Sequence, residues 1–492
     1  MNRKGFILLN TIIFSSIAIT IVYGFIGWAG TSLKATRHLI AREQAFQIAE
    51  AGIDYYRWHL AHSPTDYQDG TGAEGPYIHD FKDKDGNVIG QYTLTITPPI
   101  TGSTLIKIKS TGTVVSNPEV HRTIMSHLAI PSLAKYAVVA NDVMRFGEGT
   151  ETFGPIHANG GVRFDGIAHN IVTSAVSSYD DPDHEDSGTE KLEFGVHTHV
   201  KPPPASGTYT NYVSAETPPN TVNERTDVFI AGRIFPYPTA DFVGITANIS
   251  QMKTDAQSDG HYYNPSGSLG YHLVLKTNDT YDLYKVTSLT AVPNGCKNKL
   301  NEDGWGTWSI KSSGGQTLLG NYNFPNNGII FLDDNVWVDG QINTARLTIV
   351  AGHFPDIIAS RRSITINNDL IYTNYDGQDV IGLIAQKNIN VGLMSEDDLR
   401  IDAAIVAQNG RAGRYYYGNG GSAGNCGSTA SRDTLTLFGM IATNLRYGFA
   451  FTDGTGYDLR YLNYDANLLY GPPPSFPLTS DKYSTVFWEE QK

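Results

Sequence analysis

Charged residues are scarce in this chain of 492 residues, at 17% of the sequence, and they form no basic clusters. No run of Lys and Arg interleaved with aromatic residues follows residue 45. The net charge of -13 therefore argues against a nucleic-acid surface, because phosphate binding needs clustered Lys and Arg. P-loop and zincin patterns are also missing. We therefore predict a protein that is not an enzyme, carries no cofactor and does not bind nucleic acid.

Cysteine is nearly absent, since Cys296 and Cys426 are the two in the sequence. Each lies in a turn-rich stretch with no second cysteine nearby, so both are predicted to be exposed. In an oxidising compartment such a pair is expected to form a disulfide. Sequence spacing does not place the two thiols within bonding distance, so two separate thiols are the alternative.

The longest stretch without charge lies at the N-terminus. Gly5 to Leu33 contains no charged residue and directly follows Arg3 and Lys4. This run exceeds the roughly 20 apolar residues that span a bilayer, and it is too long for the core of a cleaved secretory signal. The basic residues before it keep the extreme N-terminus in the cytoplasm and place the rest of the chain outside the membrane.

The same helical pattern continues beyond the apolar run. Small and apolar residues recur at spacings of four and three on one stripe: Ala41, Ala45, Ile48, Gly52 and Tyr55. The sequence therefore predicts one helix over residues 6–62. Its first half spans the membrane, and its second half packs against other elements.

The opening residues MNRKGF, the apolar helix and the later AFQIAEAG at 45–52 resemble the leader and N-terminal helix of type IV pilins. The likeness is greatest to minor pilins and pseudopilins, including PilX-like proteins. The resemblance implies that residues 1–5 are a leader, which a prepilin peptidase removes after Gly5 before methylating Phe6. The expected partners are this peptidase, the inner membrane and other pilin subunits.

Asn10 departs from the family pattern, which has Glu at the fifth mature position. In the family, this Glu is thought to neutralise the N-terminal ammonium of a neighbouring subunit. An unpaired carboxylate at membrane depth costs about 2.5–3.5 kcal/mol, so it is retained where a partner exists. Its absence resembles the pseudopilin at the filament tip. The alternative is that Asn10 is sequence drift in a subunit interspersed along the shaft.

Residues 63–130 are predicted to form a small pilin-like β domain. Pro64 begins a linker that runs to residue 76. Three segments, 90–97, 105–110 and 121–128, then alternate apolar and polar residues with the period of a strand. They predict an antiparallel sheet packed on the second half of the helix.

Beyond Pro131, short apolar triplets recur between Asn, Asp and Gly residues, for example at 329–331, 347–350 and 364–366. This pattern predicts a β-solenoid of the right-handed β-helix type, with its first rungs at 131–179 and its head at 326–492. The stretches 156–166 and 347–407 also resemble large PilX-like exported proteins at the level of fold. The irregular period leaves a β-sandwich as the competing interpretation. The fold class is α+β and predominantly β.

An insertion is predicted over residues 180–325. It contains one helix at 239–258, with an apolar face at Phe242, Ile245, Ile249, Met252 and Ala256. A hairpin follows, formed by residues 271–276 and 281–286.

Three groups of side chains are candidate sites. His197 and His199 could gather a divalent cation with the acidic stretch Asp180, Asp181, Asp183, His184, Glu185 and Asp186. A solvated acidic loop is the simpler interpretation, so no metal is predicted. Paired carboxylates on a solenoid face could act as acid and base, and the nearest in sequence are Asp376, Asp379, Asp397 and Asp398. Their neighbours indicate turns.

The third group is the Gly- and Tyr-rich loop at 408–431, which contains Tyr415, Tyr416 and Tyr417. Tyrosine supplies large contact area at low entropic cost, so a mobile loop of this kind is a candidate binding surface. Its ligand would be a surface polysaccharide or a cell-surface receptor. A loop that merely covers the flank of the head is the alternative.

The predicted function is that of a minor, tip-proximal subunit of a type IV pilus or pseudopilus, which contributes to filament assembly and surface adhesion. Such a subunit is held in the cell membrane by one helix, with its C-terminal domain outside, and reaches the cell surface in the filament. The alternative is a membrane-anchored β-helix protein that binds or cleaves polysaccharide.

Overall fold

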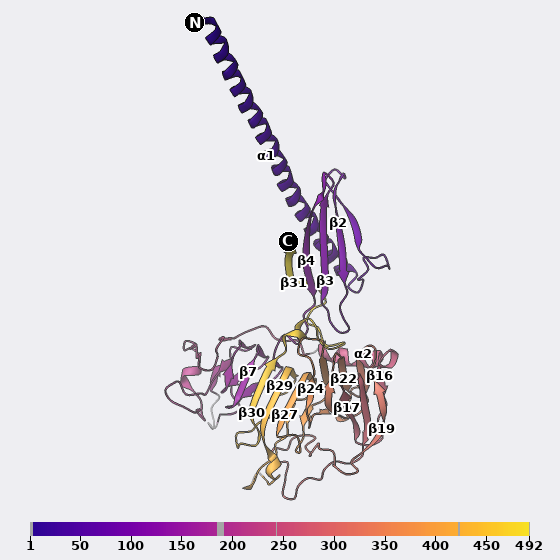
Figure 1. Cartoon of the computed structure of the whole chain (residues 1–492). Helices are drawn as coiled ribbons and strands as arrows, with labels where there is room; N and C mark the ends of the chain where they lie inside the picture. Colours follow the sequence, from indigo (N-terminus) through magenta and orange to yellow (C-terminus); the bar gives the residue numbers. More distant parts are fainter. Residues whose placement is uncertain (1–2, 185–190, 243, 422–423, 492) are drawn as a thin grey trace. The chain divides into compact units, whose positions relative to one another are not determined.

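The computed structural model describes residues 3–184, 191–242, 244–421 and 424–491. The chain divides into two units (Figure 1). Unit 1 comprises Met1–Pro99, Leu105–Ile130 and Lys482–Lys492, and unit 2 comprises Ile100–Thr104 and Pro131–Asp481. The fold is α+β and predominantly β, as predicted.

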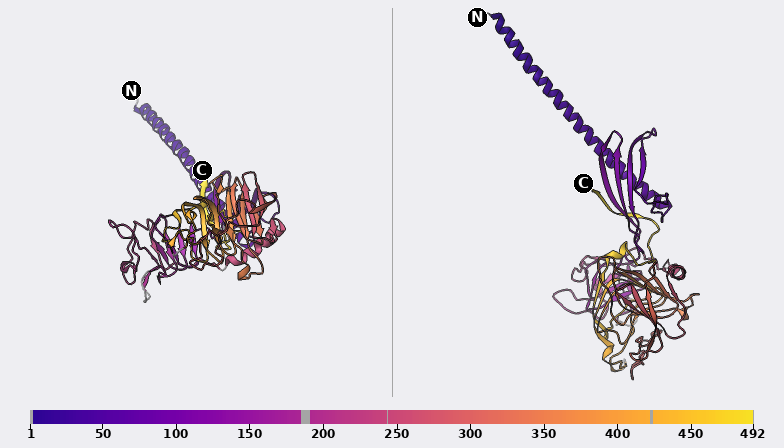
Figure 2. Two further views of the ribbon diagram at one scale, coloured as in Figure 1. Left: turned by 90° about the horizontal axis from the view of Figure 1, so that it is seen from below. Right: turned by 45° about the vertical axis from the view of Figure 1, so that its right-hand side comes forward.

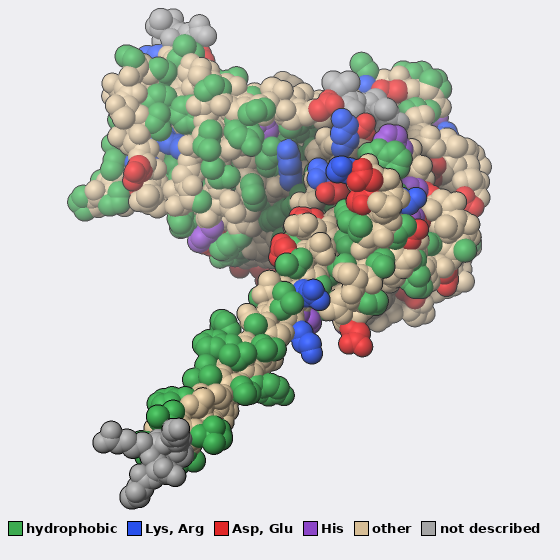
Figure 3. Space-filling view, turned by 90° about the horizontal axis from the view of Figure 1, so that it is seen from above, with side chains coloured by type: hydrophobic (Ala, Val, Ile, Leu, Met, Phe, Trp, Pro, Cys, Tyr) green, Lys and Arg blue, Asp and Glu red, His purple; other side chains and the backbone are tan. Residues whose placement is uncertain are grey.

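Unit 1 begins with a single long helix, α1 (Arg3–His62). The first half of α1 exposes its apolar side chains, for example Phe14 at 70% and Trp28 at 68%, and Figure 3 shows them along the helix. By length and composition, α1 could cross a membrane, with a mean hydropathy of 2.1 in its most apolar window. From Ala41 onward one side is buried, and the predicted stripe is confirmed up to Gly52, with Tyr55 half-buried.

The sheet of unit 1 is antiparallel, in the order β1-β2-β3-β4-β31. Its strands are β1 (Tyr77–Lys82), β2 (Val88–Thr97), β3 (Ile106–Val114), β4 (Asn117–Ala129) and β31 (Ser484–Gln491). β2, β3 and β4 confirm the three predicted segments. The sequence analysis did not identify β1, where Tyr77 alone is buried, so the strand carries little hydrophobic alternation.

Close packing of α1 on the sheet depends on glycine. A Cβ on Gly112 of β3 would lie 2.1 Å from the carbonyl oxygen of Ala45 and 2.5 Å from the amide nitrogen of Ala49. The missing side chain therefore lets the helix backbone rest directly on the strand. Ile48 and Tyr56 of the helix are buried in the core cluster between helix and sheet.

The C-terminal segment corrects the predicted domain boundary at 326–492. β31 belongs to unit 1, where Trp488 pairs with Ser126 of β4 and packs edge-on against Phe46 at 6.0 Å between ring centroids. Residues 131–481 are thus inserted between two neighbouring strands of one sheet. The sequence analysis missed this because β31 is an exposed edge strand, whose residues carry little signal of their partner.

Unit 2 is built from parallel strand ladders. The first ladder runs through ten strands, each parallel to the next: β16 (His261–Tyr263), β20 (Ile329–Leu332), β22 (Arg346–Ala351), β25 (Val380–Ala385), β27 (Asp398–Ala407), β29 (Ser431–Thr443), β5 (Val138–Ala140), β8 (Ile156–Ala158), β11 (Val172–Ser174) and β15 (Arg233–Ile234). In register, these strands stack a column of buried aliphatic residues that includes Ile349, Leu383 and Ile405.

Two further ladders in unit 2 are also formed by parallel strands. The second contains β17 (Gly270–Lys276), β21 (Val336–Ile342), β23 (Ile364–Thr365), β26 (Ile389–Val391) and β28 (Ala412–Arg414). The third joins β21 to β24 (Leu370–Tyr372), then to the first halves of β27 and β29, and then to β30 (Gly456–Tyr464), β7 (Thr150–Phe153) and β10 (Ile167–Ala168). Figure 1 shows β24, β27, β29 and β30 side by side, and Figure 2 shows the same succession from below.

The spatial order of the strands differs from the sequence order. Ile441 of β29 pairs with Val138 of β5, so the strands that open unit 2 stack on those that close it. The segment after β15 returns along the outer side of the first ladder through α2 (Gly244–Ser258). Phe242, Ile249 and Met252 are buried there, as predicted, but the helix begins at Gly244 instead of residue 239.

The remaining strands are attached to this framework. β17 and β18 (Thr280–Val286) form the predicted antiparallel hairpin, and β18 pairs with β19 (Gln316–Asn323). β6 (Met144–Phe146), β9 (Val162–Phe164) and β14 (Val196–His197) form a three-stranded parallel sheet. β12 (Ser178–Asp180) and β13 (Leu192–Phe194) form a separate antiparallel hairpin.

Candidate functional site

The residues predicted for processing and assembly all lie on the exposed half of α1. Phe6 is 64% exposed, and Asn10 is half-buried. Gly5 lies within the same helix. Their proposed roles depend on an enzyme and on neighbouring subunits, and these roles remain predictions.

The structure corrects the prediction of an exposed tyrosine loop. Tyr415, Tyr416 and Tyr417 are 2%, 8% and 1% exposed, so their rings are not available as a mobile contact surface. Tyr417 donates a hydrogen bond to the carbonyl of Gly306 at 2.7 Å, and Tyr416 donates to Asp453 at 2.6 Å. Tyr415 and Tyr417 belong to a small satellite core.

A buried arginine and a disulfide complete this satellite core. The guanidinium of Arg414 lies 4.9 Å from the centre of the Tyr417 ring and donates to the carbonyls of Leu393 and Thr429. Burial lowers the pKa of Arg414 to about 10, although nearby tyrosines oppose the shift. Cys296 and Cys426 form a disulfide with their Cα atoms 4.3 Å apart. Cys426 is buried, contrary to the expected exposure.

The loop also contains Gly420-Gly421-Ser422-Ala423-Gly424, which has the spacing of a nucleophile elbow. Such an elbow needs a strand that turns sharply into a helix. Here Asn419 and Asn425 form an antiparallel bridge around the segment, so the described residues on either side make a hairpin-like turn. Ser422 itself lies outside the described residues.

The four carboxylates that the sequence offers as candidate acids and bases lie in turns or on the surface. Asp379 is buried and accepts backbone hydrogen bonds from Thr373 and Asn374, which fixes the turn before β25. Asp376 accepts from the side chain of Gln378 at its own turn. Asp397 and Asp398 are exposed at the start of β27.

Asp181 and His184 of the acidic stretch instead form a buried cluster with His197 and His199, which corrects the expected solvated loop, whereas Asp180 is exposed and Asp183 pairs with Arg446. We call this the histidine cluster: Asp181, His184, Glu193, His197 and His199. Four of its side chains are at most 2% exposed, and that of His184 is 6% exposed. Glu185 and Asp186, also considered with this group, lie outside the described residues.

Local strand pairing brings the cluster together. Asp181 and His184 follow β12, and the β12–β13 hairpin sets Glu193 opposite Tyr179. His197 ends β14 and is paired with Arg163 of β9, and His199 follows two residues later, so the two imidazoles can point to the same side. Glu193 was not selected from the sequence, although its position four residues before His197 and six before His199 is a usable signal.

The side chains converge on one carboxylate oxygen. Oε2 of Glu193 lies 2.6 Å from Nε2 of His184, 3.0 Å from Nε2 of His197 and 3.1 Å from Nε2 of His199. Oδ2 of Asp181 lies 3.9, 3.6 and 4.0 Å from the same three nitrogens. One ligand atom from each of Asp181, His184, Glu193 and His199 can be chosen so that all four lie within 4.8 Å of one another.

The opposite edges of the rings face backbone carbonyls. Nδ1 of His199 lies 3.0 Å from the carbonyl oxygen of Tyr209, and Nδ1 of His197 lies 3.3 Å from that of Phe194. Because a carbonyl can only accept, each Nδ1 carries a proton. Arg163 donates to Asp181 at 3.3 Å and to Asp165 at 2.7 Å.

The charges of the cluster shift its protonation. Burial opposes the charged form of His197, but Asp181 and Glu193 outweigh it and raise the pKa of His197 to about 9. Burial likewise disfavours the ionised carboxyls, yet the histidines hold the pKa values of Asp181 and Glu193 well below their usual range. The described groups alone would therefore form a buried network of ion pairs.

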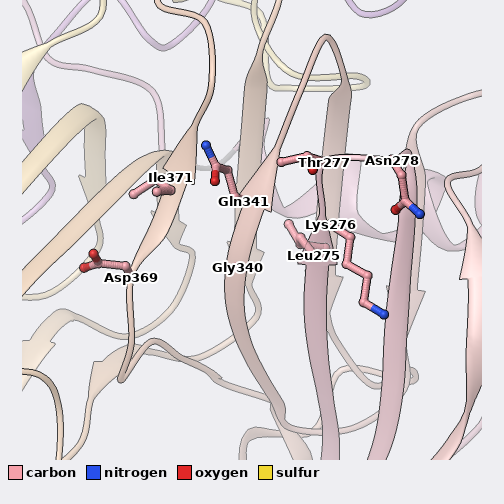
Figure 4. A pocket seen from close by; sticks show the side chains of 8 residues that line it. All are labelled: Leu275, Lys276, Thr277, Asn278, Gly340, Gln341, Asp369 and Ile371. Atoms are coloured by element: carbon pink, nitrogen blue, oxygen red, sulfur yellow. The ribbon is translucent and has the colours of Figure 1, made fainter.

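Cavities among the described residues of unit 2 include a smaller and a larger one. The smaller, of about 660 Å³, is formed at the ends of β17, β21 and β24 (Figure 4). Its charged groups already have partners: Lys276 binds Asp282 at 2.7 Å, and Asp369 accepts a hydrogen bond from the amide of Arg400 at 2.7 Å.

The larger cavity is an open cleft of about 1230 Å³, lined by basic, acidic and aromatic side chains. Arg411 and Phe451 belong to one part of its lining. Arg163 and Tyr209 belong to another, and both contact the histidine cluster. The cluster therefore adjoins one wall of this cleft.

Comparison with known proteins gives little further guidance. No protein-family model matches the sequence, and no curated protein matches it significantly. Among solved structures, the chain aligns with the competence-associated pilin ComZ from Thermus thermophilus at 11% identity, covering 92% of this chain and 97% of that one. The TM-score of this alignment is 0.31, which is too low to support an argument about fold or function.

Proposed function

We propose that this protein is a minor, tip-proximal subunit of a type IV pilus or pseudopilus. The observation that carries the proposal is the division of α1 into two halves within one unbroken helix. The first half exposes an apolar surface all round, and the second half packs against an antiparallel sheet. An exposed apolar helix needs lipid or other helices around it. The membrane supplies lipid before assembly, and a filament core of like helices surrounds the helix afterwards.

In this proposal unit 1 is the pilin module and unit 2 is the part displayed outside. Unit 2 is proposed to be a β-solenoid. Its parallel ladders support a solenoid over a sandwich, because sandwiches pair antiparallel strands. The cleft of about 1230 Å³ replaces the tyrosine loop as the candidate surface for a polysaccharide or cell-surface receptor.

Maturation provides the decisive experiment. The intact mass of protein purified from a host with an active prepilin peptidase should show loss of Met1 to Gly5 and one added methyl group on Phe6. Gly5→Leu should prevent both changes, and Gly24→Leu, further along the same helix, should prevent neither. Recovery of an uncleaved N-terminus from such a host would refute the pilin assignment.

Tip placement is tested separately at Asn10. A subunit with no neighbour above it needs no carboxylate there, so Asn10→Glu should give no gain in incorporation, because it adds an unpaired charge among apolar helices. Labelled protein should decorate filament ends. Uniform labelling along the fibres would refute the tip position and leave the pilin assignment intact.

A membrane-anchored protein that binds or cleaves polysaccharide is the second candidate, and the open cleft is the observation that favours it. Release of reducing sugar ends from polysaccharide, together with an uncleaved N-terminus, would establish it over the filament subunit.

A further inference from the structure

We propose that the histidine cluster binds one divalent transition-metal ion, with Zn²⁺ the expected occupant. This inference concerns unit 2 alone and does not depend on the filament role. It rests on the separations of the donor atoms and on one buried nitrogen that has no hydrogen-bond partner among the described residues.

The donor separations match a metal site. Two ligands of a tetrahedral Zn²⁺ ion, each bound at about 2.0–2.1 Å, lie about 3.3 Å apart. The distances from Glu193 Oε2 and Asp181 Oδ2 to the three Nε2 atoms run from 2.6 to 4.0 Å and bracket this value. One ion could therefore be bound by the four residues whose ligand atoms lie within 4.8 Å of one another, which are Asp181, His184, Glu193 and His199, with His197 beside them.

His197 supplies an independent observation. Its side chain is 0% exposed, and among the residues that the structure describes its Nε2 has no hydrogen-bond partner. Glu193 Oε2 is 3.0 Å away, but the two atoms do not meet the geometry of a hydrogen bond. A buried ring nitrogen that lies beside carboxylates without a hydrogen bond is costly unless something else binds it.

The donor types select the class of metal. Imidazole nitrogen suits Zn²⁺, Cu²⁺, Fe²⁺ and Ni²⁺, whereas Ca²⁺ and Mg²⁺ prefer sites made of oxygen alone. The carbonyls of Tyr209 and Phe194 orient the rings of His199 and His197, as outer partners do for metal-bound histidines. Arg163 orients Asp181 in the same way.

The ion would join segments that are otherwise connected by few contacts. It would link the β12–β13 hairpin to the end of β14 and hold Arg163 and Tyr209 in the wall of the cleft. We therefore expect metal binding to stabilise unit 2 and to order this wall.

The test uses tag-free, full-length protein in detergent. Elemental analysis of the purified chain should find about one zinc per molecule. After removal of metal with a chelator, added Zn²⁺ should raise the melting temperature of unit 2. Co²⁺ should bind in its place and give visible ligand-field absorption that Zn²⁺ abolishes.

Variants separate the cluster from other histidines. His199→Ala should weaken Zn²⁺ binding by at least about 100-fold, because loss of an outer partner alone costs 10–100-fold. His169→Ala is the matched control: this partly exposed histidine pairs with Glu151 in the same unit, and its loss should leave binding unchanged.

Three results would overturn the proposal. The first is wild-type protein that contains no metal and shows neither Co²⁺ absorption nor a thermal shift with Zn²⁺. The second is equal loss of binding in His169→Ala and His199→Ala. The third is competition by Ca²⁺ or Mg²⁺ at concentrations similar to Zn²⁺. Because the Co²⁺ spectrum is measured on the wild-type chain, the test holds even if His199→Ala fails to fold.

Discussion

The two units solve the same packing problem in different ways. Unit 1 buries one face of an antiparallel sheet against the second half of α1, and leaves the first half of that helix uncovered. Unit 2 buries aliphatic columns between parallel ladders, and its strands cover one another. A unit whose apolar surface remains exposed needs contacts with other molecules, whereas a unit whose apolar columns are buried within it can act as a separate displayed body.

This comparison implies that the units unfold separately, and the largest effect should come from the column of unit 2. Leu383 is fully buried between Ile349 and Ile405 in neighbouring strands. Leu383→Ala should destabilise unit 2 by about 3–4 kcal/mol, because it leaves a cavity that rigid strands cannot close. Calorimetry should show the transition of unit 2 lowered and that of unit 1 unchanged. Leu459→Ala, at an exposed position of β30, is the control and should shift neither.

Loss of the disulfide should lower the free energy of unfolding of unit 2 slightly less than Leu383→Ala does. Cys296 and Cys426 are 130 residues apart in sequence, so their bond restricts a long loop of the unfolded chain. Replacing both with Ala should cost unit 2 about 3 kcal/mol under oxidising conditions. Reductant should lower the stability of the wild-type protein similarly and leave the double variant unchanged. Recovery of both cysteines alkylated without reductant would contradict the bond.

A substitution at the contact between α1 and β3 tests whether unit 1 can be destabilised without affecting unit 2. Gly112→Ala would place a methyl group against the backbone of Ala45 and Ala49, so the helix must move away from the strand. We expect a loss of about 2 kcal/mol, confined to the transition of unit 1. Gly448→Ala, where a Cβ would meet nothing within 4 Å, should be tolerated. A common shift of both transitions in either variant would refute independent unfolding.

The smallest effect concerns pH. Burial lowers the pKa of His157, a hydrogen bond that its ring donates to Asn159 opposes this shift, and Lys135 adds to it. The unfolded histidine, with a pKa of about 6.5, therefore takes up a proton before the folded one does. Stability from this group is present above that pH and is lost as the pH falls below it. His157→Gln should flatten this loss for unit 2, and an unchanged slope would exclude His157 as its source.

Local patterns in the sequence were sufficient for part of this structure. The stripe on α1, the strands β2 to β4 and the β17–β18 hairpin follow from residues within a few positions of one another. The pairing of β29 with β5 joins Ile441 to Val138, and no local pattern indicates that partner. The same holds for β31, whose side chains are mostly exposed.

In the candidate sites, too, residue types could be identified from local sequence, whereas burial depends on contacts with distant residues. Two histidines at alternate positions were visible in the sequence, but their burial depends on the hairpin that places Glu193 over them. Tyrosine and glycine suggested an exposed loop at 408–431. Tyr417 and the disulfide instead hold that loop inward, through contacts with residues more than a hundred positions earlier in the sequence.

The position of β31 at the end of the chain delays completion of the sheet in unit 1 during synthesis. The hydroxyl of Ser484 donates to the carbonyl of Ala129, across 355 residues of sequence. At a synthesis rate of 5–20 residues per second, β4 waits roughly 20–70 s for its last neighbour. During that interval its edge is open to pairing with other chains. If synthesis stops anywhere in unit 2, the edge of β4 stays unpaired. The sheet of unit 1 can therefore be completed only after the whole of unit 2 has been synthesised.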